Sequence, residues 1–456
     1  MAKKKQIELT IEEKLQNALV PKEEQPYKIP SNWCWIRLEN IAEWGSGGTP
    51  SRKRKEYYNG NIPWIKTGEL NNGYIFNSEE KITELGLKNS SAKLYPINTV
   101  IIAMYGATIG KVGILSIEAT TNQACACAIV YKNILFKYVF HYLIYQKEAF
   151  INKSKGGAQP NLSQEIIKKH EIPLPPIKEQ QRIVNIIESL FAKLDRAKEL
   201  IENTLAQFEQ NKMAILHKAF TGELTAKWRK ENNIDLSSWQ DYQLKDICEK
   251  ITDGTHNSPI NTDLGDYMYI TAKNIKEEGI DLSKITYVSS DIHEKIYARC
   301  NVEFGDVLYI KDGATTGIAT INTIKEQFSL LSSVAVLKPK KNKLLAKYLV
   351  YKLNSNEVRN MMINNMSGVA ITRLTLTKIK QAKMKFPTIE EQQEIVNILD
   401  KLLVKYNKIK NLEQQLEKIE LLKKAILAKV FRGELGTNNP DEESAENLLK
   451  EILAEK

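Results

Sequence analysis

The sequence lacks the features that mark secreted, membrane-spanning and metal-binding proteins. It has only five cysteines, and none belongs to a C-x-x-C pair that could hold zinc: Cys34, Cys125, Cys127, Cys248 and Cys300. We therefore expect reduced thiols and no bound metal. No apolar run approaches the roughly 18 residues needed to cross a bilayer, and the N-terminus has no apolar secretory stretch. These absences predict a cytoplasmic protein.

Motifs of catalysis and nucleotide binding are also missing. The five histidines are scattered, no acidic nuclease cluster stands out, and no G-x-G-x-x-G opens a helix. The segment 106–111 resembles a phosphate-binding loop, but it has three residues between its glycines instead of four. Val112 also stands where that loop needs a hydroxyl. The sequence therefore favours a binding or adaptor protein over an enzyme.

Acidic residues are too few to balance the basic ones. The formal net charge is +10, and residues 437–456 carry six acids against two lysines, which leaves +14 on the remaining chain. Such an excess suits a polyanionic partner such as nucleic acid. A general enrichment in lysine would give the same balance, so charge alone does not decide between the two explanations.

What the sequence does contain is a long internal repeat. Residues 179–186 and 391–398 agree at seven of eight positions, and residues 214–224 and 425–435 agree at eight of eleven. The offsets of these two matches, 212 and 211 residues, are far longer than the period of a solenoid. The chain is therefore predicted to hold two copies of one module and its connecting element.

The two halves keep the same order of features outside these matches. Each begins with a tryptophan and a Leu-x-x-Ile segment, followed by a Gly-Thr turn. Residues 95–114 match residues 302–321, and both are β-branched apolar runs broken by a Gly-Ala-Thr turn, which predicts strands. Residues 137–150 and 344–361 are expected to be helices. Each half is thus predicted to be an α+β module of about 140 to 150 residues.

A proline-containing segment ends each module, and the hydrophobic period then becomes helical. Apolar residues spaced by threes and fours form heptad-like stripes after both segments. Pro176 suits the first turn of one helix, and Thr388 with Glu391 predicts a capping box for the other. Gly222 and Gly433 suit the C-terminal ends.

Each of these helices should run about 40 residues, or roughly 60 Å. A helix of this length with one apolar stripe needs a partner, and its own repeat is the obvious one. Antiparallel pairing would let the modules project from opposite ends. The alternative is that each helix packs on its own module or on another subunit.

Several loops have chemistry suited to nucleic acid. Arg52, Lys53, Arg54 and Lys55 lead into two tyrosines, which places positive charge beside aromatic rings, although a merely solvated basic loop has the same composition. In the second half the same frame carries different polar side chains. Two domains that recognise different base sequences are expected to have equivalent loops with different polar side chains. Drift after duplication would also vary the loops first.

The combined motifs resemble those of type I restriction-modification specificity subunits, over nearly the whole chain. They are the helix start PPI-x-EQ-x-x-I, the helix end AF-x-GEL, and the opening W-x-W-x-x-L-x-x-IAE-x-GSGGTPSR with the later YY-x-G-x-IPWI. This resemblance implies two target-recognition domains separated by two long antiparallel coiled-coil helices, in a pseudo-two-fold arrangement. The implied boundaries are 1–26 for an N-terminal docking segment, 27–175 and 238–387 for the recognition domains, 176–225 and 388–436 for the spacer helices, and 437–456 for the acidic tail.

The resemblance also implies a function. Each recognition domain would read one half of a split, asymmetric site in double-stranded DNA. Two modification (methyltransferase) subunits would bind S-adenosylmethionine and methylate adenines, which they reach by base flipping. Restriction/translocase subunits would use ATP and Mg²⁺ for translocation and cleavage. This chain would bind no cofactor and would carry out no chemistry itself.

Candidate DNA contacts follow from position and chemical type. In the first half they are Arg52, Arg54, Lys55, Tyr57, Lys66, Tyr105, Thr108, Lys111, Gln159 and Asn161. In the second half they are His256, Asn257, Lys273, Asn274, Lys311, Thr315, Thr316 and Arg373.

Three other interpretations remain open on the sequence. One is the specificity component of a two-subunit system that cuts on both sides of its site. Another is a helical scaffold with no role at DNA, whose binding should not show the steep salt dependence of counterion release. The third is an enzyme whose active site has no recognisable motif.

Overall fold

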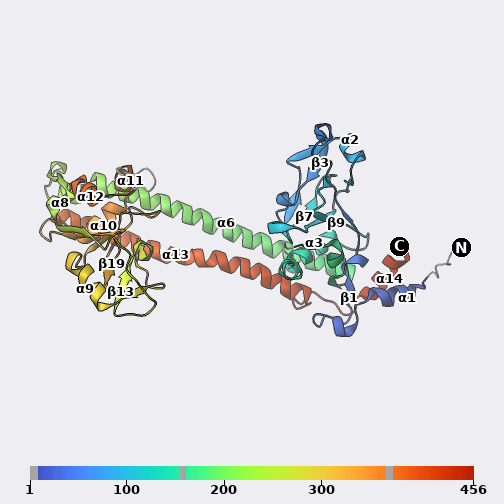
Figure 1. The fold of residues 1–456 in the computed structure, drawn as a ribbon. Helices are drawn as coiled ribbons and strands as arrows, with labels where there is room; N and C mark the ends of the chain where they lie inside the picture. Colours follow the sequence, from blue (N-terminus) through green and yellow to red (C-terminus); the bar gives the residue numbers. More distant parts are fainter. Residues whose placement is uncertain (1–8, 155–160, 365–372, 456) are drawn as a thin grey trace. The chain divides into compact units, whose positions relative to one another are not determined.

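The structure is a computed structural model that describes residues 9–154, 161–364 and 373–455, without the side chains of residues 403–410. The chain forms two compact units (Figure 1). The first consists of Met1–Glu199 with Gln415–Lys456, and the second of Leu200–Gln414. Each unit contains one mixed module of strands and short helices, together with parts of two long helices. The predicted α+β class with two tandem domains is confirmed.

In the described residues of the first module, the strands form three sheets. The five-stranded sheet has the order β2 (Ala42–Ser46), β9 (Cys125–Val130), β6 (Val100–Ala103), β7 (Val112–Leu115) and β4 (Gly73–Ile75). A three-stranded sheet has the order β5 (Glu80–Ile82), β3 (Tyr58–Ile65) and β8 (Thr120–Thr121). A short antiparallel pair joins β1 (Cys34–Arg37) to β10 (Glu171–Leu174). The pair β1–β10 therefore ties the beginning of the module to its end.

The second module repeats this plan. Its main sheet has the order β12 (Cys248–Asp253), β20 (Val334–Pro339), β17 (Val307–Ile310) and β18 (Ala319–Ile321). The smaller sheet contains β16 (Thr286–Val288), β13 (Tyr267–Ile270) and β19 (Ser329–Leu330), and a hairpin joins β14 (Ile275–Lys276) to β15 (Gly279–Ile280). The closing pair is β11 (Gln240–Gln243) with β21 (Lys383–Phe386).

Both main sheets are buried on two faces. Along β9, Cys125 and Cys127 pack in one hydrophobic cluster, whereas Ala126 and Ala128 pack in another. Alternate residues of a strand point to opposite faces, so one short run of small apolar side chains serves two cores. The sheet is thus fixed firmly, and the loops at its edges are held by a rigid frame.

The expected helices within the modules are each broken in two. Residues 137–150 form α3 (Phe136–Tyr145) and most of α4 (Lys147–Lys153), and residues 344–361 form α10 (Ala346–Asn354) and most of α11 (Asn356–Asn364). In the second module the break lies at Ser355, whose backbone is extended (ψ 142°) and whose hydroxyl donates to the carbonyl of Lys352 at 2.7 Å. The serine side chain thus competes with the helical backbone, so the expectation of one continuous helix was wrong.

Shorter helices complete the two modules. They are α2 (Glu84–Lys88), α5 (Gln164–Lys168), α7 (Ala226–Glu231), α8 (Leu244–Ile247), α9 (Ser290–Arg299) and α12 (Leu376–Gln381).

The two long helices are α6 (Ile177–Thr221) and α13 (Ile389–Phe431), of 45 and 43 residues. Both end where the sequence predicted. Gly222 and Gly433 follow the last helical residues with φ of +86° and +71°, in the left-handed region that favours glycine. Each helix is continuous, and each has one end in the first unit and the other in the second.

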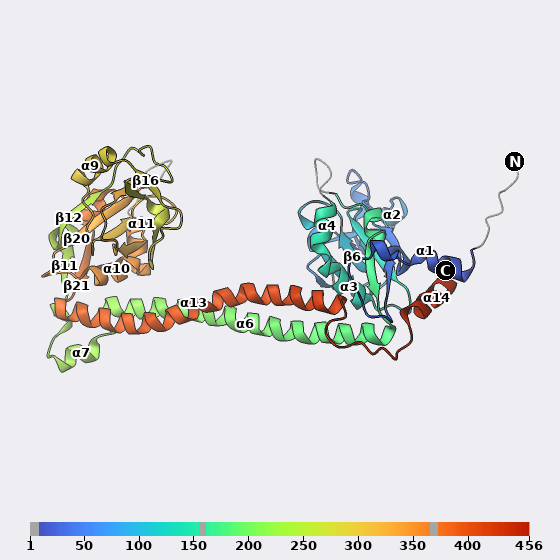
Figure 2. The same ribbon diagram turned by 90° about the horizontal axis from the view of Figure 1, so that it is seen from below.

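The long helices pair antiparallel. In the first unit Lys198 forms an ion pair with Glu420 at 3.3 Å, and Lys423 forms one with Asp195 at 2.5 Å. From residue 195 to residue 198 of α6, the paired residue of α13 moves from 423 back to 420, so the two helices run in opposite directions. The two ribbons lie side by side in both views (Figures 1 and 2). The antiparallel pairing predicted from the stripes is therefore confirmed.

The ends of both helices also belong to the module cores. The first core contains Ile183 and Ile187 from the start of α6 and Phe431 from the end of α13. The second contains Ile395 from the start of α13 and Phe220 from the end of α6. Each helix therefore packs on its own module at its start and on the other module at its end. Pairing with the repeat, which the sequence favoured, and packing on the helix's own module, which it left as an alternative, thus occur together.

The two repeated motifs contact each other. Glu391, in the repeated helix start, is fully buried and accepts hydrogen bonds from Thr225 (2.6 Å), Arg229 (2.5 Å) and the indole of Trp239 (3.0 Å). Thr225 directly follows the Gly-Glu-Leu motif that ends α6. The carboxylate of Glu391 is thus used between helices, and only the Thr388 half of the predicted capping box forms, at 3.5 Å.

The first unit contains the matching contact. Glu179 is likewise fully buried, and it accepts from the hydroxyl of Thr437 and pairs with Arg182 at 2.7 Å. Thr437 follows the second Gly-Glu-Leu motif. The start of each long helix is therefore fastened to the end of the other.

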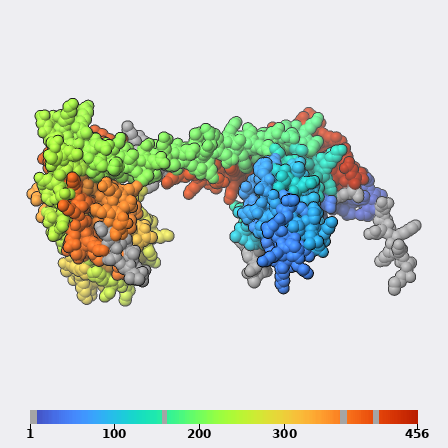
Figure 3. All heavy atoms as spheres, turned by 90° about the horizontal axis from the view of Figure 1, so that it is seen from above, coloured from blue at the N-terminus to red at the C-terminus, as the bar shows by residue number. Residues whose placement is uncertain are grey.

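The terminal segments pack on the first module. Helix α1 (Ile11–Ala18) lies against α14 (Ala445–Glu455), near the blue and red ends of the chain in Figure 3. Apolar residues of both helices join the first core. Lys450 pairs with Glu12 across the two helices at 2.9 Å. Within residues 9–154, 161–364 and 373–455, no helix is long and apolar enough to span a membrane.

Candidate nucleic-acid interface

One edge of the main sheet carries predicted contacts in both modules. In the second module β12 and β17 both pair with β20, and Asp253 and Tyr309 both lie opposite Ala335. The ends of the two strands therefore meet at one edge, and Lys311 follows directly beyond β17. Asp253 and Lys311 are both buried at this edge, so neither the predicted charge of Lys311 nor the neighbouring one is directly open to a partner.

The same edge holds matching backbone bridges in the two modules. Tyr105 bridges Asn161 in the first module, and Asp312 bridges Arg373 in the second. The side chains of Tyr105, Asn161 and Arg373 are exposed. At this edge the first module thus has a tyrosine and an amide, and the second module has a carboxylate and a guanidinium. Gln159, also predicted as a contact, lies outside the described residues.

In the basic loop, Arg52 is held by the module itself. Its guanidinium pairs with both carboxylate oxygens of Glu80, at 2.6 and 3.3 Å, and lies 4.5 and 4.9 Å above the rings of Tyr58 and Trp64. The hydrogen bond with Arg52 lowers the pKa of Glu80 and raises that of the arginine. Lys66 also pairs with Glu80, at 3.0 Å. Arg52 and Lys66 therefore help to fold the loop.

The rest of the basic loop faces solvent. Lys53, Arg54 and Lys55 are exposed, and Tyr57 is half-buried beside them. Arg54 makes a loose contact with Glu56 at 3.4 Å, with both side chains at least half exposed. These three cations are available to a polyanion, because neighbouring carboxylates bind them weakly or not at all among the described contacts.

The Gly-Ala-Thr turns owe their shared glycines to backbone geometry. Gly106 and Gly313 have φ of +66° and +100°, which side chains disfavour. Thr108 and Thr316 donate their hydroxyls to carbonyls of their own turns, at 3.0 and 2.7 Å. Thr316 is buried, whereas Thr315 is exposed. Of the three predicted threonines, Thr315 is thus the one that the turn leaves most open to a partner.

The remaining candidates differ in availability. Asn274 is buried, accepts from the amide of Thr271 at 3.0 Å and donates to the carbonyl of Asp281 at 3.1 Å. It therefore caps a turn and is not open to a partner. Exposed or half-buried positions are taken by Lys111, His256, Asn257 and Lys273.

A charged cluster lies at the edge of the second module. Asp253 is 1% exposed; its carboxylate lies 2.5 Å from Arg299, 3.5 Å from Lys311 and 3.7 Å from His256. Lys311 also pairs with Asp312 at 3.0 Å. We call Asp253, His256, Arg299 and Lys311 the Asp253 cluster. It brings two predicted contacts, His256 and Lys311, into one group.

Sequence reasoning missed Asp253, Arg299 and Glu80. Asp253 stands beside a recognised Gly-Thr turn, and that position was a usable signal. Arg299 is the last residue of α9 and belongs to no motif. Glu80 is acidic, and acidic residues are not expected at a DNA surface unless they orient a cation.

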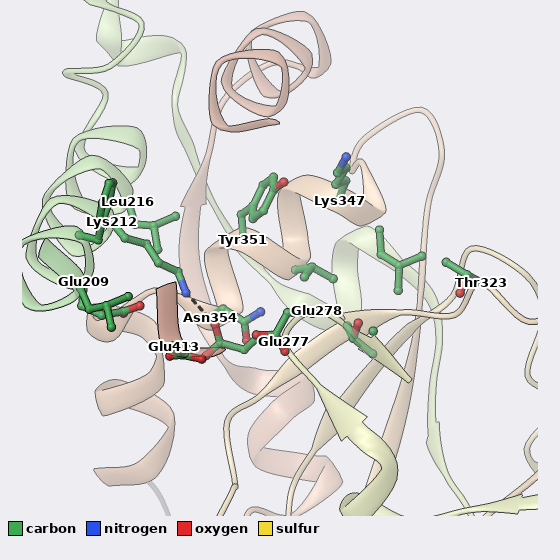
Figure 4. A pocket seen from close by; sticks show the side chains of 16 residues that line it. Glu209, Lys212, Leu216, Glu277, Glu278, Thr323, Lys347, Tyr351, Asn354 and Glu413 are labelled. Carbon is green, nitrogen blue, oxygen red and sulfur yellow. Dashed lines mark hydrogen bonds and ion pairs between the residues drawn. The ribbon is translucent and has the colours of Figure 1, made fainter. Parts of the chain in front are cut away.

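A cavity among the described residues lies elsewhere. It measures about 570 Å³ and lies in the second unit, between α6, α10 and the β14–β15 hairpin (Figure 4). Lys212 of α6 reaches Glu277 of the hairpin at 3.1 Å, and Glu209, Glu278 and Glu413 also line the walls. None of the predicted DNA contacts lines this cavity, and its carboxylates do not suit a polyanion.

The cysteines are buried thiols. Burial raises the pKa of each, to about 12 for Cys127, Cys248 and Cys300. A thiol with so high a pKa is neutral and unreactive at neutral pH. In the part of the chain that the structure describes, no group of His, Cys, Asp and Glu is arranged to hold a metal ion.

Two stretches of the chain, residues 30–207 and 237–421, match the family described as type I restriction modification DNA specificity domain. The MjaIX specificity subunit, a type I restriction enzyme subunit of Methanocaldococcus jannaschii, is 26% identical over 90% of this chain and 94% of its own length. The EcoKI specificity subunit of Escherichia coli is 24% identical over 94% of this chain and 96% of its own.

Solved structures have the same fold. The HsdS subunit from Thermoanaerobacter tengcongensis has a TM-score of 0.55 and 19% identity, and the match covers 90% of this chain and 100% of that one. A chain from a study of complex assembly in the type I R-M system has a TM-score of 0.67 and 21% identity, with the same coverage.

These similarities extend over both halves of the chain, and they agree with the duplicated modules, the antiparallel helices and the contacts between the repeated motifs. The chain belongs to the family of type I restriction-modification DNA specificity domains, of which it carries two, and it is a specificity subunit.

Proposed function

We propose that each recognition domain reads one half of a split, asymmetric site in double-stranded DNA. The observation that carries the proposal is that the main sheet of each module has an equivalent edge with an equivalent backbone bridge. The same backbone bridge presents Tyr105 and Asn161 in one module and Asp312 and Arg373 in the other. Equal frames with different hydrogen-bonding groups suit two different base sequences, because base edges differ in their pattern of donors and acceptors.

Binding to the phosphate backbone would come from the exposed cations. Lys53, Arg54 and Lys55 lie on the first module, and Lys273 lies on the second. Phosphate contacts set the position of a protein on the duplex, whereas base contacts specify the sequence. The net charge of +14 outside the acidic tail supports this division of roles.

The chain would act as a non-catalytic subunit. Two modification subunits, which bind S-adenosylmethionine, would methylate one adenine in each half-site. Restriction subunits would supply ATP-driven translocation and Mg²⁺-dependent cleavage. The names of the relatives support this assignment, since they are specificity subunits of type I restriction enzymes.

The experiment is coexpression of the chain with the methyltransferase encoded beside it, in a host without adenine methylation. Modified adenines are then mapped by single-molecule sequencing. We expect a split motif that is methylated on both strands. A stable complex that leaves all adenines unmodified would contradict the proposal.

A chimera provides the matched control. Replacing residues 27–175 by the corresponding domain of another specificity subunit should change one half of the motif and leave the other half and the gap unchanged. A change in both halves would contradict the assignment of one half-site to each domain.

A further inference from the structure

The two modules have equivalent loops between their sheets. The β2–β3 loop (residues 47–57) and the β12–β13 loop (residues 254–266) both run from the main sheet to the smaller one. Each loop includes the repeated Gly-Thr turn near its start. The backbone amides of Gly48 and Thr255 each donate to a carbonyl of the smaller sheet at 2.8 Å. The two loops therefore leave their modules at the same place and are held there in the same way.

The side chains that these two loops expose are chemically different. The first loop has the basic run 52–55, whereas the second has neither lysine nor arginine. The second loop carries instead Ile260 and Leu264, which are 84% and 86% exposed. They are the two most exposed large apolar side chains in the part of the chain that the structure describes. A single exposed leucine needs no explanation, but two such side chains on one short loop mark a contact surface.

Both side chains are exposed although the backbone of their loop is held in place. Thr262, midway between them, exchanges two backbone hydrogen bonds with Tyr287 of β16, at 3.1 and 2.8 Å. Its hydroxyl also donates to the carbonyl of Leu264 at 2.5 Å. Gly265 packs so closely on β16 that an added Cβ would lie 2.7 Å from that of Tyr287. A fixed backbone thus presents Ile260 and Leu264 to their surroundings.

The chemistry of this loop suits one group on DNA. The loop belongs to the candidate interface, since it also carries the predicted contacts His256 and Asn257, both exposed. Phosphates are bound by cations and hydrogen-bond donors, and the side chains of Ile260 and Leu264 are neither. In the major groove the apolar group on a base edge is the 5-methyl of thymine. Burying that methyl against an aliphatic side chain removes both from water, which favours a T·A pair.

We propose that Ile260 and Leu264 recognise a thymine methyl group in the half-site of the second domain. The equivalent loop of the first domain binds phosphates through Lys53, Arg54 and Lys55. One loop position of the duplicated frame therefore contributes affinity in the first domain and base preference in the second. This proposal rests on the proposed function, since it presupposes that the second domain reads a half-site.

The test removes only the methyl group, with the full chain copurified with its modification subunits. Methylation mapping of the wild type defines the motif, and a chimera that exchanges residues 238–387 identifies the half-site of the second domain. That half-site contains a thymine, because one of its adenines is methylated. Deoxyuridine, which pairs like thymidine but lacks the 5-methyl, then replaces each thymine of the half-site in turn. Competition binding followed by fluorescence anisotropy compares the duplexes.

The wild type should bind at least one deoxyuridine duplex roughly fourfold more weakly, since one buried methyl group contributes ~0.8 kcal/mol. The double variant Ile260→Ala/Leu264→Ala should bind that duplex and its thymine counterpart equally. Its salt dependence should be that of the wild type, because neither side chain is charged. Phe304→Ala is the matched control. Phe304 is also exposed (62%) on the second module, but it precedes β17, whereas the candidate interface follows β17. This variant should keep the wild-type difference.

Two results would overturn the proposal. If deoxyuridine weakens binding of the wild type and the double variant equally, or of neither, Ile260 and Leu264 contact no thymine methyl. If the double variant keeps the wild-type melting temperature but no longer copurifies with the modification subunits, the loop binds a protein instead of DNA. A wild type that shows no split motif would instead overturn the proposed function, and this proposal with it.

Discussion

The hydroxyl of Thr225 donates to the carboxylate of Glu391 at 2.6 Å, and this contact fastens the end of one long helix to the beginning of the other. The two residues belong to the two motifs that the sequence repeats. Thr437 and Glu179 form the equivalent contact in the first unit. The repeated helix start and the repeated helix end thus contact each other, and this contact, which we call the joint, occurs once in each unit.

The joint makes Glu391 important for stability. Glu391→Ala should lower the free energy of unfolding by about 3 to 5 kcal/mol, because it leaves the buried guanidinium of Arg229 without its partner. Urea denaturation followed by tryptophan fluorescence measures the loss. The neighbouring exposed Glu390→Ala should change the stability by less than about 0.5 kcal/mol. Equal stability of the two variants would contradict the structural role of the joint.

A buried lysine predicts a dependence on pH. Lys352 lies 4.9 to 6.0 Å from the rings of Phe220, Trp239, Tyr348 and Phe386. Desolvation lowers its pKa to about 8, although Glu357 acts in the opposite direction. The folded state thus disfavours the charged form. The resulting penalty is complete below pH 8 and disappears as the pH rises from about 8 toward the unfolded pKa of about 10.4.

Lys352→Met should therefore stabilise the chain at neutral pH, by up to about 3 kcal/mol from the pKa difference. The four rings favour the ammonium group and reduce this gain. The advantage of the variant should shrink as the pH rises from 8 to 10, which melting temperatures at several pH values would show. A pH-independent difference would mean that Lys352 does not titrate in this range. Tyr142 stands at the matching position of the first module, which suggests Lys352→Tyr as a second variant.

The exposed part of the basic loop predicts a change in salt dependence. Replacing Lys53, Arg54 and Lys55 by alanine should weaken binding to all duplexes at low salt. The slope of log K against log salt should become shallower by about 0.9 for each phosphate that the variant no longer neutralises. Fluorescence anisotropy between 50 and 200 mM salt, roughly the range in which this effect is large, measures the slope. A loss of sequence preference at constant slope would instead indicate base contacts.

The long helices predict the gap between the half-sites. Inserting seven residues into both α6 and α13 keeps the apolar stripes in register and lengthens each helix by about 10.5 Å. This is close to three base pairs at about 3.4 Å each, and the methylated motif should gain a comparable number of unspecified positions. An active variant with an unchanged gap would show that the helices do not set the spacing. An insertion in α6 alone, which breaks the pairing, is expected to abolish methylation.

The sequence by itself determined the duplication, the α+β class and the two long helices. Each of these depends on a period or a spacing: the β-branched apolar runs at residues 95–114 and 302–321, the threes and fours after Pro176, and the glycines that end both helices. Such patterns are local, and local geometry imposes them on any chain that folds. The helix breaks at Gln146 and Ser355 were missed because the apolar spacing does not show them. At Ser355 a single side chain interrupts the backbone.

Only the tertiary structure decided which charged side chains are free. Arg52 and Arg54 are two residues apart and look alike in sequence, but Glu80 and two aromatic rings hold the first, whereas the second makes only a loose contact with Glu56. Lys311 was predicted as a DNA contact and Arg299 was not, and only the fold shows that both lie against Asp253. The partners of a charge come from strands and helices distant in the chain. Availability for DNA is therefore a property of the folded surface.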